Sequence, residues 1–174
     1  MYQQKVILGV VPVKRSFLSM EEAVRQKNRF MAVIRKTLSE SVDIIDIDDI
    51  SENGICWRTE ETPAIVEKFM TAGIDALFLP FCDFGEEQAA AQIAASFHLP
   101  VLIWGARDER PNTDVSRGRD TQCGMFAATK VLRRHGVKFS YIYNCETESD
   151  AFAQGYDRFI RTAAVLKALR NLRL

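Results

Sequence analysis

The chain has 174 residues, 47% of them hydrophobic, which is enough to bury one sizeable core. Lys and Arg together number 23, and so do Asp and Glu, so the formal net charge is zero. A neutral chain has no overall field that attracts nucleic acid or an anionic membrane, and we exclude both as partners. We expect one domain over residues 1–174 whose partner is a small neutral molecule or another protein.

The N-terminal apolar run is too short to cross a membrane and ends without a small-residue cleavage site, which predicts a cytoplasmic protein. The four cysteines form no C-x-x-C pair, and no helical pair of His ligands lies near them. The spacing therefore predicts that this chain has no zinc or other metal site of its own.

Segments with the apolar pattern of strands alternate with segments of helical periodicity. The predicted strands are residues 5–11, 42–47, 74–81, 101–104 and 139–143. The predicted helices are residues 19–38, 62–72, 86–97, 122–135 and 149–169. Ser19 with Glu22 forms a capping box, Gly73 and Gly136 are stop signals, and residues 105–120 are the longest polar segment.

Five strands that alternate with five helices predict an α/β fold with a single parallel sheet and right-handed crossovers. We expect a doubly wound, flavodoxin-like or Rossmann-like three-layer sandwich with the strand order 2-1-3-4-5. The acidic and apolar alternation in residues 42–47 indicates that the second strand lies at an edge of the sheet.

In such sheets the ligand crevice lies outside the carboxyl ends of the strands, beside the point where the strand order reverses. Arginine offers several directed donors to hydroxyl groups, and an aromatic ring covers the C–H side of a sugar. The alternative is that the arginines form solvated ion pairs and that the aromatic ring simply packs. The candidate substrate-binding residues at these strand ends are Lys14, Arg15, Cys82, Asp83, Phe84 and Arg107.

We identify no catalytic residue. Cys82 has the position of a nucleophile, but no His lies near it in sequence, so a buried, inert thiol is expected. Trp57 with Arg58 is compatible with a binding surface and equally with a packed loop anchor.

The turn after the first strand, VPVKRSFLS, has neither a G-x-G-x-x-G fingerprint nor a phosphate loop, which argues against a dinucleotide or nucleotide. A flavodoxin would hold the FMN phosphate there in a hydroxyl-rich loop, whereas this turn offers only Ser16 between its strand and Phe17. Lys14 and Arg15 stand where a phosphoacceptor receiver needs an acidic pair, which rejects that class. Flavin binding stays a weaker alternative, and we expect no cofactor in this chain.

Four segments resemble the N-terminal region of the L-fucose isomerase and L-arabinose isomerase-like family. They are GVVPVKRSF, DALFLPFCDFGEEQAAAQIAASFHLPVLIWGARDE, DTQCGMFAATKVLRRHGVKFSYIY and FIRTAAVLKALRNLRL, and they span nearly the whole chain. The second is the most specific, because the family has there a strand, an aromatic-containing loop, an alanine-rich helix and a strand ending in Trp-Gly or Tyr-Gly.

The resemblance implies an aldose-ketose isomerase that works through an ene-diol with a divalent metal, typically Mn²⁺, held by Glu, Asp and His of later domains. The family's closing helix is followed by a strand that opens the next domain, so we expect a truncated isomerase. We expect a homo-oligomer whose partners are the missing C-terminal isomerase domains or neighbouring subunits.

In the family, the N-terminal domain forms one wall of the sugar site through a basic residue after the first strand and an aromatic residue after the third. The matching positions are Arg15, or else Lys14, and Phe84. The loop after the third strand is shorter than in typical L-fucose isomerases and has Phe where they tend to have Trp. The resemblance therefore does not identify the sugar. The leading hypothesis is a substrate-lining and assembly domain that is inactive alone. The alternative is a stand-alone sugar-binding or regulatory module.

Overall fold

The computed structural model describes residues 5–109 and 118–172, and its strands form one parallel sheet in the order β2-β1-β3-β4-β5. This confirms the predicted fold class and strand order. The strands are β1 (Val6–Val10), β2 (Val42–Ile45), β3 (Ala76–Phe81), β4 (Val101–Gly105) and β5 (Ser140–Tyr141).

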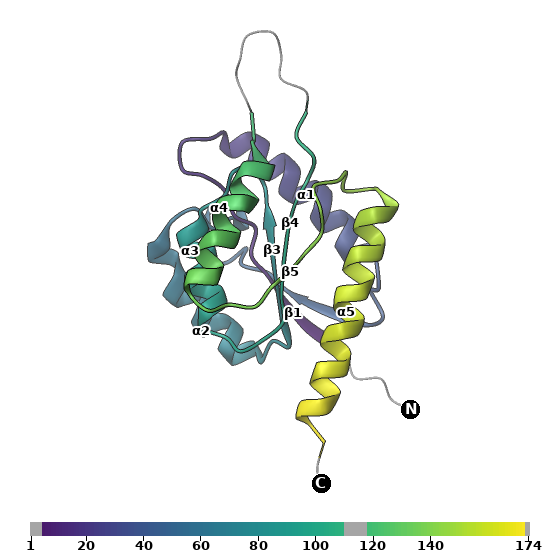
Figure 1. The fold of residues 1–174 in the computed structure, drawn as a ribbon. Helices are drawn as coiled ribbons and strands as arrows, with labels where there is room; N and C mark the ends of the chain where they lie inside the picture. The colour runs from purple at the N-terminus through teal and green to yellow at the C-terminus, as the bar shows by residue number, and fades with distance from the viewer. Residues whose placement is uncertain (1–4, 110–117, 173–174) are drawn as a thin grey trace.

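Five α-helices cover the sheet, with α1 and α5 on one face and α2, α3 and α4 on the other (Figure 1). Their N-terminal signals act as predicted, because the hydroxyls of Ser19 and Ser149 accept hydrogen bonds from the amides of Glu22 and Phe152. The helices are α1 (Met20–Lys36), α2 (Thr62–Ala72), α3 (Glu87–Ala95), α4 (Thr121–Arg134) and α5 (Asp150–Arg170), and two 3-10 turns, η1 (Glu52–Gly54) and η2 (Thr59–Glu61), precede α2.

Successive residues of the central strands supply two separate cores. Phe78 and Trp104 face α1 and α5, while Leu79 and Ile103 face α2, α3 and α4. All six residues of β3 are buried, as expected of a strand that has neighbours on both sides and helices on both faces. None of the helices in the described part of the chain has the length and apolar composition needed to cross a bilayer.

Two strands end two residues before their predicted carboxyl ends. Only Ser140 and Tyr141 of the predicted strand 139–143 form a ladder with β4, because the register shifts by one residue after Ile142 and pairing resumes only as a single bridge between Ala106 and Cys145. The second strand ends at Ile45, where an aspartate turn follows and the amide of Asp48 donates to the Asp46 carboxylate. In both cases the apolar pattern continues past the point where the backbone pairing stops.

Candidate functional site

The carboxyl ends of β1 and β3 meet at the upper edge of the sheet in Figure 1. Past the end of β1, Val13 forms bridges with both Phe81 and Cys56, and the amide of Cys82 donates to the Val13 carbonyl at 3.0 Å. The structure therefore brings together five of the six predicted site residues, which are Lys14, Arg15, Cys82, Asp83 and Phe84.

Arg15 lies over the ring of Phe84, with 4.7 Å between its Cζ atom and the ring centroid. Its guanidinium pairs with Glu86, at 3.1 Å, and with Glu87, both at the start of α3. The Arg15 side chain keeps 17% exposure, so it is held by α3 without being sealed off. Arg15 therefore forms an ion pair that is mostly shielded from solvent, which differs from the solvated pair considered from the sequence.

Asp83 is the most constrained acidic group at this edge. Its Oδ1 atom accepts hydrogen bonds from the amides of Arg15, at 2.7 Å, and Gly85, at 2.9 Å. Gly85 has φ +77°, which a glycine adopts without strain, and this shapes the turn that closes on Asp83. Asp83 is only 1% exposed, its Oδ2 atom has no partner, and burial raises the pKa of the carboxyl.

Lys14 is buried against the indole of Trp57 instead of facing solvent. Its ammonium donates to the Arg15 carbonyl at 2.7 Å and lies 5.7 Å from the Trp57 ring centroid. Arg58 lies over the same ring at 4.2 Å. Trp57 is thus both a packed anchor and part of this edge, and its indole Nε1 has no hydrogen-bond partner.

Cys82 is fully buried, as expected, and burial raises the pKa of its thiol well above the usual value. The Asp83 charge adds to this rise, whereas the nearby cations Lys27, Lys14 and Arg119 oppose it. The thiol is therefore unsuited to act as a nucleophile. Cys82 is therefore close enough to four charged side chains, those of Asp83, Lys14, Lys27 and Arg119, for each of them to affect its pKa.

Arg107 is placed differently from the other predicted residues. Its backbone follows β4, where its amide donates to the Cys145 carbonyl at 3.0 Å, but its side chain is exposed and forms no hydrogen bond or ion pair with a described residue. Its carbonyl accepts from the Nη2 atom of Arg119 at 2.6 Å. The guanidinium that reaches the strand ends is therefore that of Arg119. Arg119 belongs to the polar segment 105–120 and was not among the predicted site residues.

Arg119 is 6% exposed, and its Nε atom lies 3.8 Å from Glu22 Oε1. Glu22 also accepts from Gln26 Nε2 at 2.8 Å, and neither Gln26 Oε1 nor Arg119 Nη1 has a hydrogen-bond partner in the described part of the chain. The signal that could have identified Arg119 is its position just before the start of α4 at Thr121, where a side chain can reach the strand ends. We call Lys14, Glu22, Gln26, Asp83 and Arg119 the carboxyl-edge cluster.

Gly124 on α4 allows this helix to approach the Phe84 loop, because a Cβ atom there would overlap the Phe84 carbonyl oxygen. We expect Gly124→Ala to lower the free energy of unfolding by about 1–3 kcal/mol, since backbone atoms must move to relieve the overlap. Urea unfolding of this variant and of Gly118→Ala, where a Cβ meets nothing within 4 Å, measures the difference. Equal stability of the two variants would contradict this close contact.

No group of three or more His, Cys, Asp or Glu side chains among the described residues is arranged to hold a metal ion. The acidic members of the carboxyl-edge cluster are engaged with backbone amides and an arginine. The residues present therefore do not fit a Mn²⁺ site, and we derive no step of a reaction through a metal on this chain.

The reversal of strand order beside β1 defines a doubly wound α/β domain, and buried polar residues lie at its topological switch point, beyond the carboxyl end of β1. The family model described as the fucose/sulfoquinovose isomerase N-terminal domain matches residues 9–170. The chain belongs to this family, which confirms the resemblance found in the sequence.

Two solved structures from Bacillus anthracis are also similar. An azoreductase from strain Sterne has 11% identity and a TM-score of 0.39, with 94% of this chain and 98% of that one covered. An FMN-dependent NADH-azoreductase from strain Ames Ancestor, in complex with FMN, has 8% identity and a TM-score of 0.34, with 92% and 99% covered. A search of the curated proteins found no match. Both TM-scores are too low to support an argument about function.

Proposed function

We propose that this domain forms one wall of the sugar site of an aldose-ketose isomerase and takes part in assembling that enzyme. The observation that carries the proposal is a set of buried polar atoms at the carboxyl edge that have no hydrogen-bond partner among the described residues. Two are acceptors, Asp83 Oδ2 and Gln26 Oε1, and two are donors, Arg119 Nη1 and Trp57 Nε1. A buried polar atom left unpaired costs about 1–3 kcal/mol, so each of these atoms needs water or a ligand.

The mixture of donors and acceptors favours a neutral polyol over an anion. A hydroxyl group both donates and accepts, so a sugar can pair with atoms of both kinds, whereas a phosphate or sulfonate group accepts only. The charges of the carboxyl-edge cluster point the same way, because Lys14 and Arg119 are matched by Asp83 and Glu22. The substrate class that this edge suits is therefore an uncharged aldose or ketose.

Within this proposal the chain binds and orients the sugar. Arg15, held by Glu86 and Glu87, offers donors in a fixed place, and the half-buried ring of Phe84 supplies an apolar side. A divalent metal bound by other parts of the enzyme would supply Lewis-acid polarisation of the carbonyl. We therefore expect the domain alone to bind sugars and to leave aldose and ketose unconverted.

Thermal unfolding with sugars tests the proposal. At a sugar concentration of about ten times Kd, binding should stabilise the fold by about 1.4 kcal/mol and raise Tm by about 3–6 °C. The panel is L-fucose, L-arabinose, D-arabinose, FMN and NAD, each with and without Mn²⁺. Arg119→Met should lose most of the response to sugar, because it removes the unpaired donor, and Arg133→Met on α4 is the matched control.

A shift with a sugar that Arg119→Met abolishes and Arg133→Met keeps would support the sugar wall. A shift with FMN or NAD, or sugar shifts of equal size in both variants, would contradict it. Conversion of aldose to ketose by this chain alone would contradict its role as a partner domain.

A further inference from the structure

The outer edge of β5 is open to another strand. Ser140 and Tyr141 pair with Leu102 and Ile103 of β4, and the amide of Ile142 donates to the Ile103 carbonyl at 3.2 Å. Backbone groups of successive strand residues point to alternate sides, so the N–H and C=O of Tyr141 point away from β4. Neither group forms a backbone hydrogen bond with a described residue. This edge can therefore pair with an added strand.

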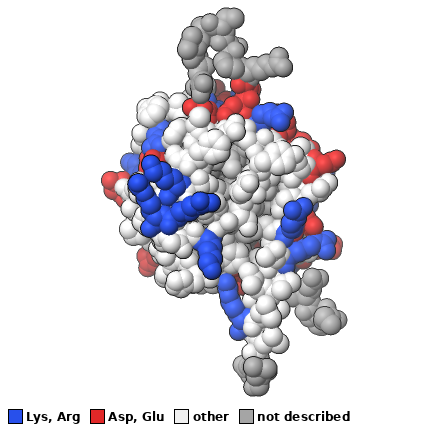
Figure 2. Space-filling view, in the orientation of Figure 1, with Lys and Arg blue, Asp and Glu red and all other residues white. Residues whose placement is uncertain are grey.

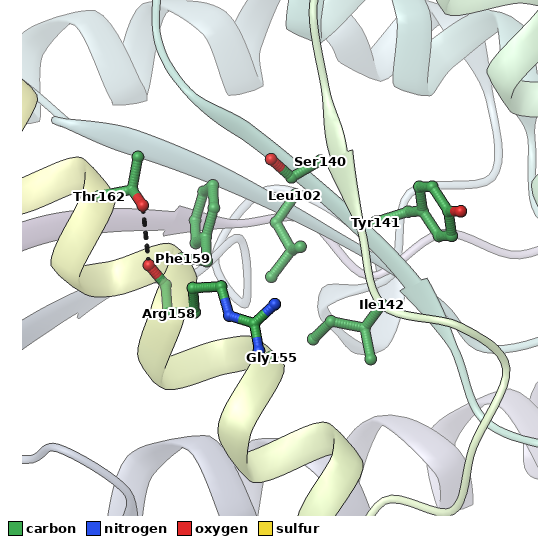
Figure 3. Close-up of a pocket in the computed structure, with 8 residues that line it drawn as sticks. All are labelled: Leu102, Ser140, Tyr141, Ile142, Gly155, Arg158, Phe159 and Thr162. Atoms are coloured by element: carbon green, nitrogen blue, oxygen red, sulfur yellow. Dashed lines mark hydrogen bonds between the residues drawn. The ribbon is translucent and has the colours of Figure 1, made fainter.

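A cavity of about 250 Å³ lies directly beside this edge, between β5 and α5 (Figure 3). Leu102, Ile142 and Phe159 give it an apolar wall. Ser140, Arg158 and Thr162 supply its polar rim. Tyr141 on the strand and Tyr143 just after it are 67% and 60% exposed. The edge thus combines unpaired backbone groups, exposed aromatic surface and room for an apolar side chain.

The surroundings of the edge are basic. Figure 2 shows an uncharged centre with groups of Lys and Arg on both flanks, while Asp and Glu lie mostly at its margins. Arg133 and Arg134 end α4, Lys138 precedes β5, and Arg158 borders the cavity; all four are exposed. None of them forms an ion pair with a described residue. The flanks therefore offer unneutralised positive charge to a partner.

This charge distribution disfavours a second copy of the chain as the occupant. A twofold axis that joins two β5 edges into one antiparallel sheet brings α4 of one copy toward α4 of the other. Arg133 and Arg134 of the two copies would then face each other, and like charges repel. An acidic segment gains from the same arginines.

We propose that the β5 edge binds an extended, acidic polypeptide segment as a sixth strand. Its backbone pairs with Tyr141, one of its apolar side chains enters the cavity, and its Asp or Glu side chains face Arg133, Arg134, Lys138 and Arg158. This surface is separate from the carboxyl-edge cluster, so sugar binding and segment binding can be tested independently.

The test uses two fluorescent decapeptides that have one central Phe for the cavity, charged residues on both faces of the strand and Val at the remaining positions; the charged residue is Glu in one peptide and Lys in the other. Fluorescence anisotropy measures their binding to the whole chain. We expect the Glu peptide to bind and to weaken with salt, and the Lys peptide to bind at least about tenfold more weakly, since charge pairs at an interface set partner choice. Equal binding of the two peptides, or binding of neither, would overturn the proposal.

Two variants with matched controls test the geometry. Tyr141→Pro removes the outward N–H without removing a bond to β4 and should weaken the Glu peptide about three- to tenfold, whereas Tyr141→Thr keeps the N–H and should not. Arg158→Glu should weaken it by a similar factor, and Lys36→Glu on α1, which contributes nothing to the cavity, should not. Unchanged binding by Tyr141→Pro or Arg158→Glu would refute the sixth strand.

Hydrogen exchange covers the case in which Tyr141→Pro fails to fold. In the unchanged chain, the Glu peptide should protect the Tyr141 amide, and absence of protection would overturn the proposal. Sedimentation velocity of the chain alone should give no dimer that depends on this edge. A dimer that Glu peptide or Arg158→Glu dissociates would identify a second copy as the occupant instead.

Discussion

Trp104→Ala should lower the free energy of unfolding by about 3–5 kcal/mol, the typical cost of deleting a buried tryptophan side chain. Trp104 is fully buried and lies 4.4 Å from Phe152 and 6.2 Å from Phe30, measured between ring centroids. It therefore joins β4 to both α1 and α5. Urea unfolding followed by far-ultraviolet circular dichroism measures the change.

Phe126→Ala is the control for this prediction, because Phe126 is 65% exposed on α4. We expect a change of less than about 0.5 kcal/mol for that variant, as for most surface substitutions. Comparable losses from Trp104→Ala and Phe126→Ala would mean that the two aromatic side chains do not differ in burial as described.

Asp83→Ala should lower the free energy of unfolding by about 2–5 kcal/mol. The substitution leaves the buried amide of Gly85 and the amide of Arg15 without an acceptor, and each unpaired group costs about 1–3 kcal/mol. Asp83→Asn keeps an oxygen at the Oδ1 position and should lose much less. Denaturant unfolding of the three proteins at one pH measures both effects, and equal losses from Ala and Asn would contradict the role of Oδ1.

The same carboxyl should also change how stability depends on pH. Burial raises the pKa of Asp83 in the folded state, so the folded chain holds this proton more tightly than the unfolded chain. This tighter proton binding adds to the free energy of unfolding. The addition is fully present at pH values below the unfolded pKa of about 3.9 and is lost as the pH rises through the pKa of the folded state. The Tm of the unchanged chain minus the Tm of Asp83→Asn should therefore become smaller as the pH rises over this range. A difference that rises instead would mean that the carboxylate is stabilised by the fold.

The sequence was sufficient for the fold because each element carries a local signal. The apolar run of β3 and the capping serines before α1 and α5 need no knowledge of the rest of the chain, and parallel connections restrict the strand order. The length of β5 was not predictable in this way. Phe139, Tyr141 and Tyr143 continue the strand pattern, but the register with β4 shifts by one residue between the Ile103–Tyr141 pair and the Ala106–Cys145 bridge, and no local pattern encodes this shift.

Only those site residues that follow a strand closely in sequence were predictable. Arg15 lies in the segment after β1, Asp83 and Phe84 lie just after β3, and the parallel sheet brings them together. Arg119 reaches the same place from the residue before α4, through a contact with Glu22 on α1 that no local pattern encodes. Arg107, which follows β4 directly, instead exposes its side chain, so position after a strand was an incomplete guide.

The state of Lys14 and Arg15 also required the structure. The sequence predicted both as candidate substrate-binding residues after the first strand, without indicating their partners. In the folded chain Lys14 is covered by Trp57, and Arg15 is held by two glutamates of α3. These partners lie 43 and about 70 residues away in sequence, and the contacts arise because the segments after β1, β2 and β3 converge at one edge.

An NMR titration with L-fucose tests most directly whether the carboxyl edge binds a sugar. We expect saturable shifts of the Trp57 indole N–H, and of the Arg15 and Gly85 amides that donate to Asp83, together with little change at Tyr141 and Phe126. Arg119→Met should remove the shifts. Shifts that are absent at saturating sugar, or that are confined to the β5 edge, would contradict the account of this domain as one wall of a sugar site.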